Sequence, residues 1–335
     1  MSASSRYLAL TGGVGGAKLA VGLAQILPPS QLAFLVNTGD DFVHYGLHVC
    51  PDLDTLMYAL SGESNPETGW GRREESWRCI ETLRALGGES WFNLGDRDLA
   101  VHLLRTERLR RGARLSEVTR ELNAALGTHH AVWPMTDDPM PTVVHTANGP
   151  LAFQHYFVRE RCAPSVQCFQ FLGSAEAKPV AGVLDWLSDP TLAGIFVCPS
   201  NPYVSIDPIL AVPGLRAAIK AAGVPVIAVS PIVAGLAIKG PTAKMMEELR
   251  VPSTALAVAL HYGDLLDGYV VDQQDEALLP ALGEAGFAAI AAPTVMLTLD
   301  DKVQLARRVC DFAQTLRPGA DPTGNQPSQG SSRGV

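Results

Sequence analysis

The residues with the clearest chemical potential form a glycine-rich loop near the start of the chain. The segment TGGVGGAKLA, residues 11–20, follows a short apolar run and precedes a helix-like stretch. Its glycines are Gly12, Gly13, Gly15 and Gly16. Such a loop lets the backbone approach a phosphate closely, and the following helix N-terminus supplies donors. We therefore predict a phosphate site here; a tight strand-to-helix turn that binds nothing is the alternative.

This loop fits neither of the two commonest nucleotide motifs. It is not a Walker A loop, because Ala17 precedes Lys18 where glycine is required, and Leu19 replaces Ser or Thr. It is not a dinucleotide fingerprint, because Lys18 stands at the sixth position counted from Gly13. The broken fingerprint argues against a nicotinamide-dependent dehydrogenase.

Pairs of aspartates are a second chemical feature. They are Asp40 with Asp41, Asp52 with Asp54, Asp96 with Asp98, and Asp137 with Asp138. Any single pair is explained equally well by helix capping or turn formation. Asp52 and Asp54 precede a helix-like run, where capping explains one carboxylate but hardly both. Carboxylates near a phosphate repel one another unless a divalent cation intervenes, and oxygen ligands favour Mg²⁺.

Three further segments carry polar groups suited to a ligand. Ser200, Asn201 and Ser205 follow an apolar run and suit a nucleotide base or ribose, although a turn held by Asn201 and two prolines is the alternative. Lys239 and Lys244 are cationic groups that are equally compatible with a solvated surface. Arg97, between Asp96 and Asp98, either forms a structural ion pair or binds a planar acceptor or phosphate. No histidine is assigned a catalytic role.

A parallel sheet would bring these loops together. Apolar runs at residues 7–10, 32–36, 195–198 and 224–229 end in polar turns, and helix-like stretches lie at 17–26, 214–222 and 242–249. Strands that alternate with helices predict an α/β, Rossmann-like parallel sheet with helices on both faces. Ligands of such sheets bind outside the carboxyl ends of the strands. The polar turns are therefore expected to converge on one crevice.

The chain divides into a core, a cap and a tail. Residues 1–61 and 176–317 are predicted to form the Rossmann-like nucleotide-binding core. Residues 62–175 are richer in Arg, Glu and Trp and contain amphipathic stretches at 75–86 and 115–126 and a hairpin signal at 147–150, so we predict an inserted, mainly helical cap that binds the acceptor. The Gly/Pro/Ser/Gln-rich tail, residues 318–335, is predicted to be disordered.

Composition excludes several classes of protein. The 335 residues are 47% hydrophobic, which supports a sizeable core, and carry a formal charge of -8, which argues against nucleic-acid binding. The six cysteines form no Cys-x-x-Cys pair. No apolar run approaches the roughly 20 residues that span a bilayer, and no signal-peptide core is present. A cytoplasmic protein with reduced cysteines is expected.

Eight ordered motifs resemble those of a known family. They are TGGVGGAKLAVGL, VNTGDDF, CPDLDTLMYAL, WFNLGDRDLAVHLLRT, PMTDDP, CPSNPYVSIDPIL, SPIVAGLAIKGPTAKMM and HYGDLLDGYVVD. In this order they resemble the 2-phospho-L-lactate transferases, the CofD/FbiA family of coenzyme F(420) biosynthesis. The resemblance runs from about residue 6 to residue 315.

The resemblance implies a reaction and a set of residue roles. A phosphorylated three-carbon acid would move from a guanosine diphosphate donor to the ribityl chain of 7,8-didemethyl-8-hydroxy-5-deazariboflavin, with Mg²⁺ required, GMP leaving, and the protein a homodimer. The glycines with Lys18 would sit at the donor phosphates, and Ser200, Asn201 and Ser205 at the guanosine. Asp52 and Asp54 would bind metal or accept the hydroxyl proton, and Arg97 would lie toward the deazaflavin or metal.

Two questions stay open at this stage. The acid transferred is phospholactate, phosphoenolpyruvate or 3-phosphoglycerate, which differ only near one carboxylate. A regulatory protein of related fold that binds nucleotide sugars is the alternative function.

Overall fold

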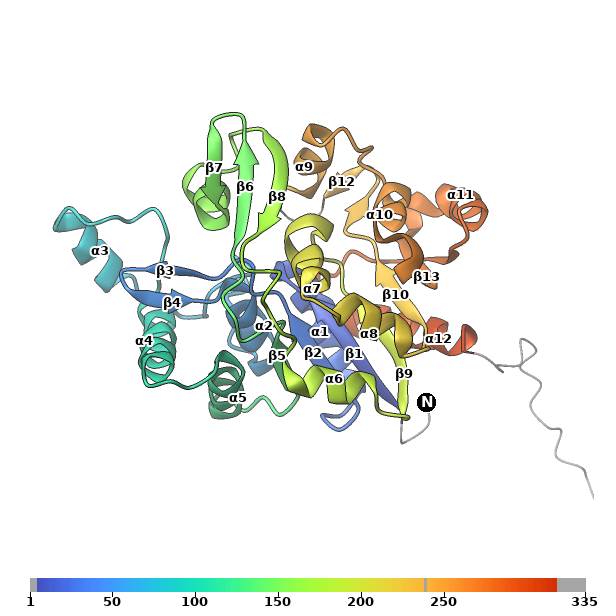
Figure 1. Cartoon of the computed structure of the whole chain (residues 1–335), viewed down its shortest axis with the longest axis horizontal. Helices are drawn as coiled ribbons and strands as arrows, with labels where there is room; N and C mark the ends of the chain where they lie inside the picture. Colours follow the sequence, from blue (N-terminus) through green and yellow to red (C-terminus); the bar gives the residue numbers. More distant parts are fainter. Residues whose placement is uncertain (1–4, 238–239, 318–335) are drawn as a thin grey trace, which may run out of the picture.

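The centre of the molecule is a parallel β-sheet. The computed structural model describes residues 5–237 and 240–317 (Figure 1). Its seven-stranded sheet has the order β14-β13-β10-β9-β1-β2-β5, and every adjacent pair is parallel. The strands are β1 (Arg6–Thr11), β2 (Leu32–Val36), β5 (Ala131–Pro134), β9 (Leu192–Val197), β10 (Val226–Val229), β13 (Gly268–Asp272) and β14 (Ala288–Ala292). The predicted parallel sheet is confirmed.

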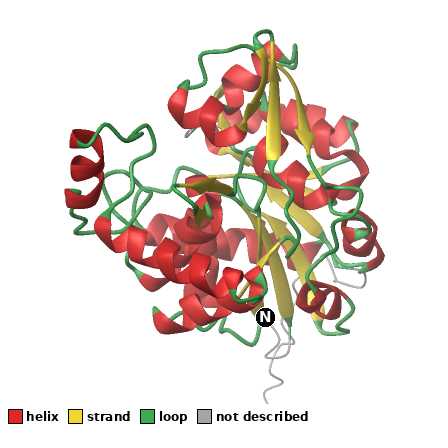
Figure 2. Ribbon diagram, turned by 60° about the vertical axis from the view of Figure 1, so that its left-hand side comes forward, coloured by secondary structure: helices red, strands yellow, loops and turns green. Residues whose placement is uncertain are grey.

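Both faces of the sheet are buried, as the nearly continuous apolar strands require. Successive residues of β1 alternate between two cores: Leu8 belongs to one and Ala9 to the other. One face is covered by α1 (Gly13–Ile26), α2 (Pro51–Ser61) and α12 (Leu299–Thr315). The other face is covered by α6 (Ala181–Leu187), α8 (Leu215–Ala221) and α10 (Ala255–Tyr262). The strands therefore lie between two layers of helices (Figure 2).

The order of the strands reverses next to β1. From β1 the chain adds β2 and β5 on one side, and from β9 it adds β10, β13 and β14 on the other. Loops that follow β1 and β9 therefore leave the sheet in opposite directions and open a crevice between them. These two loops are the glycine loop, which ends at α1, and the segment that begins at Pro199.

The cap differs from its predicted boundaries. Strand β5 lies inside residues 62–175 but pairs with β2 as the edge strand of the central sheet, and α5 (Leu115–Ala125) packs beside it. The segments outside the sheet are therefore two. The first contains α3 (Arg78–Ala85) and α4 (Asp96–Arg110), and the second contains a small sheet of β6 (Thr142–Thr146), β7 (Gly149–Ala152) and β8 (Val166–Phe171).

The predicted hairpin is present, with a short second strand. β6 pairs with β7, but β7 ends at Ala152 and the chain then turns into a π-helix, η1 (His155–Arg159). Phe153 and Tyr156 of this segment are buried. Packing of these aromatic side chains against the core outweighs the local strand preference.

The remaining elements connect these layers. They are β3 (Phe42–His44), β4 (Leu47–Val49), η2 (Pro202–Ile206), α7 (Asp207–Ala211), β11 (Ile232–Val233), β12 (Leu236–Ala237), α9 (Thr242–Glu248), η3 (Gly263–Leu265), η4 (Gln273–Leu278) and α11 (Leu279–Glu284).

Within the described ranges, no helix has the length and apolar character needed to cross a membrane. Lys239 and the tail 318–335 lie outside the described residues.

Candidate active site at the reversal of strand order

A cavity of about 590 Å³ opens beside the glycine loop. Its walls come from the segments that follow β1, β2 and β9, from the start of α2, and from the two cap segments. The predicted site residues that line it are Gly12, Gly13, Gly15, Lys18, Asp52, Asp54, Ser200, Asn201 and Ser205. Gly16 lies just behind, where a side chain would collide with Thr11 and Ser200. The polar turns therefore converge on one cavity, as predicted.

The glycine loop is held by side chains from two other loops. The Gly12 N–H donates to Ser200 Oγ at 3.2 Å, and the Gly13 N–H donates to Asp52 Oδ1 at 2.8 Å. Gly13 has a φ of 66°, which favours glycine. The amides of Val14 and Gly15 belong to the first turn of α1, where N–H groups have no acceptor within the helix. Together with the helix dipole, they give this end of the cavity a positive potential, which favours an anion.

Two carboxylates beside the loop share one amide donor. Asn37 Nδ2 donates to Asp40 Oδ1 and to Asp52 Oδ2, both at 2.9 Å. Burial raises the pKa of Asp52 to about 6, against the hydrogen bonds from Asn37 and Gly13. Burial and the neighbouring Asp52 raise the pKa of Asp40 well above its usual value.

This carboxylate pair fits a hard divalent cation. Asp40 and Asp52 both line the cavity and offer only oxygen atoms, which Mg²⁺ prefers. The raised pKa values of Asp40 and Asp52 indicate that burial destabilises the ionised form of both carboxylates. A nearby positive charge would stabilise that form. Asp40 is missing from the predicted ligands, although the Asp40-Asp41 pair directly after β2 is a signal that points to it.

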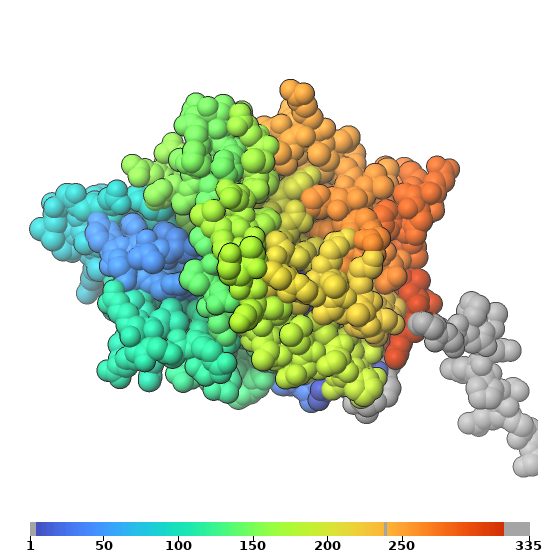
Figure 3. All heavy atoms as spheres, viewed as in Figure 1, coloured from blue at the N-terminus to red at the C-terminus, as the bar shows by residue number. Residues whose placement is uncertain are grey.

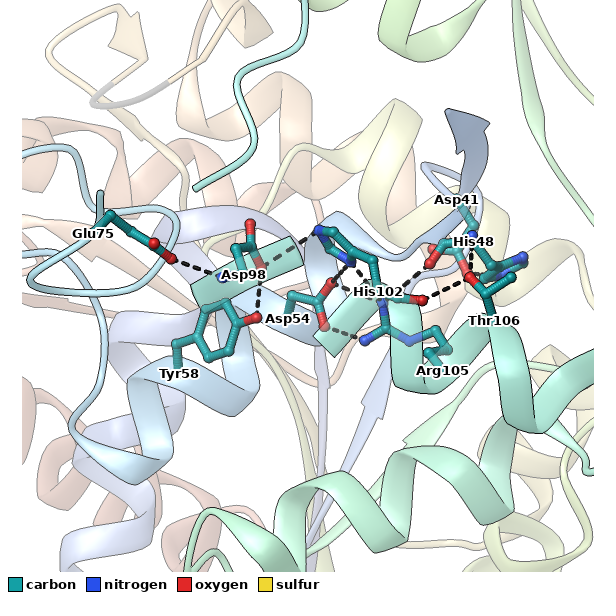
Figure 4. Close-up of polar contacts among 9 residues, drawn as sticks. All are labelled: Asp41, His48, Asp54, Tyr58, Glu75, Asp98, His102, Arg105 and Thr106. Carbon is teal, nitrogen blue, oxygen red and sulfur yellow. Dashed lines mark hydrogen bonds and ion pairs between the residues drawn. The ribbon is translucent and has the colours of Figure 1, made fainter. Parts of the chain in front are cut away.

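Asp54 has a different partner. It accepts hydrogen bonds from Arg105 Nη1 at 3.0 Å and from Arg105 Nη2 (Figure 4). Arg105 is only 1% exposed, so this is a buried ion pair between α2 and α4. The sequence-based role of Asp54 in metal binding or proton transfer stays a prediction. In this structure its carboxylate neutralises Arg105.

A chain of polar contacts extends from Asp54 along the cavity wall. His102 Nδ1 lies 3.6 Å from Asp54 Oδ2, and His102 Nε2 lies 3.5 Å from Asp98 Oδ1 (Figure 4). The Tyr58 hydroxyl donates to Asp98 Oδ1 at 2.5 Å. Burial would raise the pKa of Asp98, but the contacts with His102 and Tyr58 outweigh it and the pKa is lowered. Asp98 therefore keeps its negative charge at the cavity wall.

Arg97 does not reach the cavity. Its side chain donates to the Arg73 carbonyl at 3.0 Å and lies 3.9 Å from Glu63 and 3.8 Å from Glu74. The cavity lining includes its neighbour Asp98 but not Arg97. The structure favours the ion-pair alternative for Arg97, and its contact with a ligand remains a prediction.

The other predicted binding residues have identifiable structural partners. Asn201 Oδ1 caps η2 by accepting from the Tyr203 N–H at 3.0 Å. Lys18 Nζ donates to the Met296 carbonyl at 2.8 Å. Both side chains nevertheless border the cavity, so they hold its rim in place.

Aromatic side chains line part of the cavity and form what we call its aromatic wall. It consists of Tyr58, Trp70, Phe92, Phe153 and Phe157. The rings of Phe153 and Phe157 stack at 5.5 Å with an interplanar angle of 9°. Trp70 and Phe157 remain 42% and 38% exposed, so part of this apolar surface is open to solvent. Sequence reasoning missed this wall, because its residues come from α2 and from both cap segments.

Comparison with known proteins identifies the family of this chain. Residues 8–289 match the family described as 2-phospho-L-lactate transferase CofD. A phosphoenolpyruvate transferase from Streptomyces griseus is 42% identical over 318 residues, which cover 93% of this chain and 99% of the relative. A phosphoenolpyruvate transferase from Mycobacterium tuberculosis strain H37Ra is 36% identical, covering 91% of this chain and 97% of the relative.

The fold also has a match among solved structures. A UPF0052 family protein from Bacillus halodurans superposes with a TM-score of 0.59 at 16% identity, covering 92% of this chain and 98% of that protein. At that identity the likeness concerns the fold alone. The family match and the full-length relatives show that the chain belongs to the CofD family of 2-phospho-L-lactate transferases, which transfer a phospho-acid group in coenzyme F(420) biosynthesis.

Proposed function

We propose that this chain transfers a phosphoenolpyruvyl group from a guanosine diphosphate donor to 7,8-didemethyl-8-hydroxy-5-deazariboflavin, releasing GMP, with Mg²⁺ required. The observation that carries the proposal is one cavity that joins an anion site, a carboxylate pair and an aromatic wall. Among the three acids left open by the sequence, phosphoenolpyruvate is favoured because relatives at 36–42% identity bear that name. A homodimer and a cytoplasmic location are part of the proposal.

Each part of the cavity has a role in this reaction. The first-turn amides of α1 bind the donor phosphates, and Ser200 and Ser205 line the guanosine side. Asp40 and Asp52 would hold Mg²⁺, which when bound offsets the charge of the transferring phosphoryl group and the departing GMP. The amides of Gly13 and Asn37 fix both oxygens of Asp52, so its carboxylate has one orientation relative to the donor.

The aromatic wall suits the acceptor. A deazaflavin is a flat tricyclic ring with a polar ribityl chain. Trp70, Phe92 and Phe157 offer apolar surface to such a ring, and the anionic Asp98 lies on the same wall. With the ring held, positioning of the terminal hydroxyl against the donor phosphorus supplies much of the rate enhancement.

Product analysis tests the proposal directly. The purified chain is incubated with the deazaflavin, Mg²⁺ and the guanylylated form of each of the three acids, and the deazaflavin products are identified by mass spectrometry. We expect the phosphoenolpyruvyl adduct to dominate and to disappear when Mg²⁺ is omitted. Donor binding without any adduct would favour the nucleotide-binding regulatory protein instead.

Substitution of Gly15 tests the anion site. A Cβ at Gly15 would lie 2.5 Å from the Pro199 carbonyl oxygen, so the loop would have to move away from β9. We expect Gly15→Ala to weaken GDP binding by at least about tenfold, as measured by calorimetry, because the α1 amides no longer converge. Gly283→Ala is the matched control, since no heavy atom lies within 4 Å of a Cβ there. Equal GDP affinity in both variants would contradict an anion site at this loop.

A further inference from the structure

The β3–β4 hairpin places three metal-ligand side chains on one face. Phe42 pairs with Val49 and Val43 pairs with His48, so the next position of the same register sets Asp41 opposite Cys50. Side chains alternate along a strand, and directly opposite residues share a face. Asp41, His48 and Cys50 therefore point to the same side at the base of the hairpin, next to the start of α2.

The ligand atoms of these residues are close enough to hold one ion. The carboxylate oxygen, the imidazole nitrogen and the thiol sulfur lie within 4.8 Å of one another, and Asp41 Oδ2 is 3.4 Å from His48 Nε2. Tetrahedral zinc has bonds of roughly 2.0–2.3 Å, which separate its ligand atoms by roughly 3.3–3.7 Å. Only small side-chain movements are needed to bring the three groups onto a shared ion.

The ligand atoms are incompletely hydrogen-bonded. Asp41 Oδ1 is buried and has no hydrogen-bond partner among the described residues, His48 Nε2 is buried with only the 3.4 Å contact to Asp41 Oδ2, and the Asp41 side chain is only 10% exposed. Buried polar atoms of this kind are rare because each loses its contact with water without compensation.

A second cluster of possible metal ligands within the described ranges has similar residue types, but its carboxylate already has a cationic partner. Asp54, Asp98 and His102 also bring three ligand atoms together. There, however, Asp54 is bonded to Arg105, and His102 Nδ1 lies 3.3 Å from Arg105 Nη1. The guanidinium already supplies the positive charge. His102 Nε2 also lacks a hydrogen bond, but the carboxylates of this cluster are bonded to Arg105 and Tyr58. At the hairpin base, Asp41 Oδ1 has no such partner among the described residues.

We propose that Asp41, His48 and Cys50 bind a Zn²⁺ ion, with water in the fourth position. The mixture of carboxylate oxygen, imidazole nitrogen and thiolate sulfur suits zinc and is a poor set for Mg²⁺. On binding, the Cys50 thiol releases its proton to solvent, and the thiolate and the Asp41 carboxylate balance the two charges of the ion.

The proposed ion has a structural consequence for the cavity. Asp41 directly follows Asp40, and Cys50 stands two residues before Asp52. Zinc at the hairpin base would therefore tie together the two loops that carry the carboxylate pair, without being part of that pair. The hairpin forms part of the molecular surface between α3 and the α4–α5 region (Figure 3), so an ion has a short path to the site.

Metal analysis of the full chain tests the proposal. Protein freed of metal is titrated with Zn²⁺ against a chromophoric chelator in the presence of millimolar Mg²⁺, and separately with Co²⁺ as a spectroscopic probe. We expect one Zn²⁺ per chain and a thiolate-to-cobalt absorption band. Cys50→Ser is expected to weaken zinc binding by at least about tenfold and to remove the band, because it deletes the soft ligand.

Matched variants separate this site from others. Cys168→Ser removes an exposed cysteine and is expected to keep both the stoichiometry and the band. Asp52→Asn is expected to keep them too, since Asp52 belongs to the magnesium pair. His48→Gln is a second ligand variant that alters a 32% exposed side chain, so its fold is retained if that of Cys50→Ser is not. Zinc binding of wild-type strength in a folded Cys50→Ser or His48→Gln chain would overturn the proposal, as would a wild-type chain that binds no zinc.

Discussion

Asp52→Asn is expected to lower turnover by at least about a thousandfold and, without Mg²⁺, to make the folded chain more stable at neutral pH. The activity is lost because the neutral amide cannot hold the metal that offsets phosphoryl charge. Stability rises because a buried carboxylate with a raised pKa is removed. The substitution retains the shape of the side chain, so the hydrogen bonds from Gly13 and Asn37 keep one acceptor.

The pH dependence of this effect has a definite sign. The pKa of Asp52 rises from 3.8 in the unfolded chain to about 6 in the folded chain. Well below pH 4 the Asp52 carboxyl is protonated in both the folded and the unfolded chain, so it does not lower the free energy of unfolding. Between pH 4 and 6 the unfolded chain releases the proton first, so stability falls as the pH rises. Above pH 6 the full penalty remains, at most about 3 kcal/mol for a pKa difference of about 2.

Urea denaturation of both proteins from pH 4 to pH 8 measures this penalty. The free energy of unfolding of wild type should fall relative to Asp52→Asn across pH 4–6, and added Mg²⁺ should restore wild type while leaving the variant unchanged. Asp185→Asn, at an exposed carboxylate on α6, is the control and should follow wild type. Parallel stability curves for wild type and Asp52→Asn would contradict a raised pKa at Asp52.

Sequence reasoning succeeded where the signal is local. The apolar run at residues 32–36 is β2 itself, and the run at 7–10 falls inside β1. Glycines directly after an apolar run mark a strand-to-helix turn whatever the rest of the chain does. Because parallel strands end at one edge, the positions of Gly13, Asp40 and Ser200 around one cavity followed from the element order alone.

The missed features depend on contacts between distant segments. Arg105 looks like one of several arginines on a helix, and only the packing of α4 against α2 brings it to Asp54, 51 residues away. The strand β5 was assigned to the cap because its four residues give too short a pattern to reveal pairing with β2. The aromatic wall depends on how the cap folds back, which no local pattern specifies.

The Asp54–Arg105 pair carries the largest expected effect on stability. Asp54→Asn leaves the Arg105 guanidinium buried without its counter-charge, and an arginine cannot discard its proton. We expect a loss of about 3–5 kcal/mol in the free energy of unfolding, measured by urea denaturation. Arg105→Met should cost less, because the Asp54 carboxylate that remains lines the cavity, where water or a cation can reach it.

The double variant Asp54→Asn/Arg105→Met decides whether Asp54 is structural or catalytic. With both charges gone, stability should recover by several kcal/mol relative to Asp54→Asn, because no uncompensated buried ion remains. Disruption of the exposed Arg114–Glu117 pair by Glu117→Gln is the control and should leave the free energy of unfolding close to that of wild type. If the folded double variant also regains turnover, Asp54 acts by neutralising Arg105. If instead Asp54→Asn unfolds like wild type yet is inactive, its carboxylate takes part in the reaction and the ion pair is incidental.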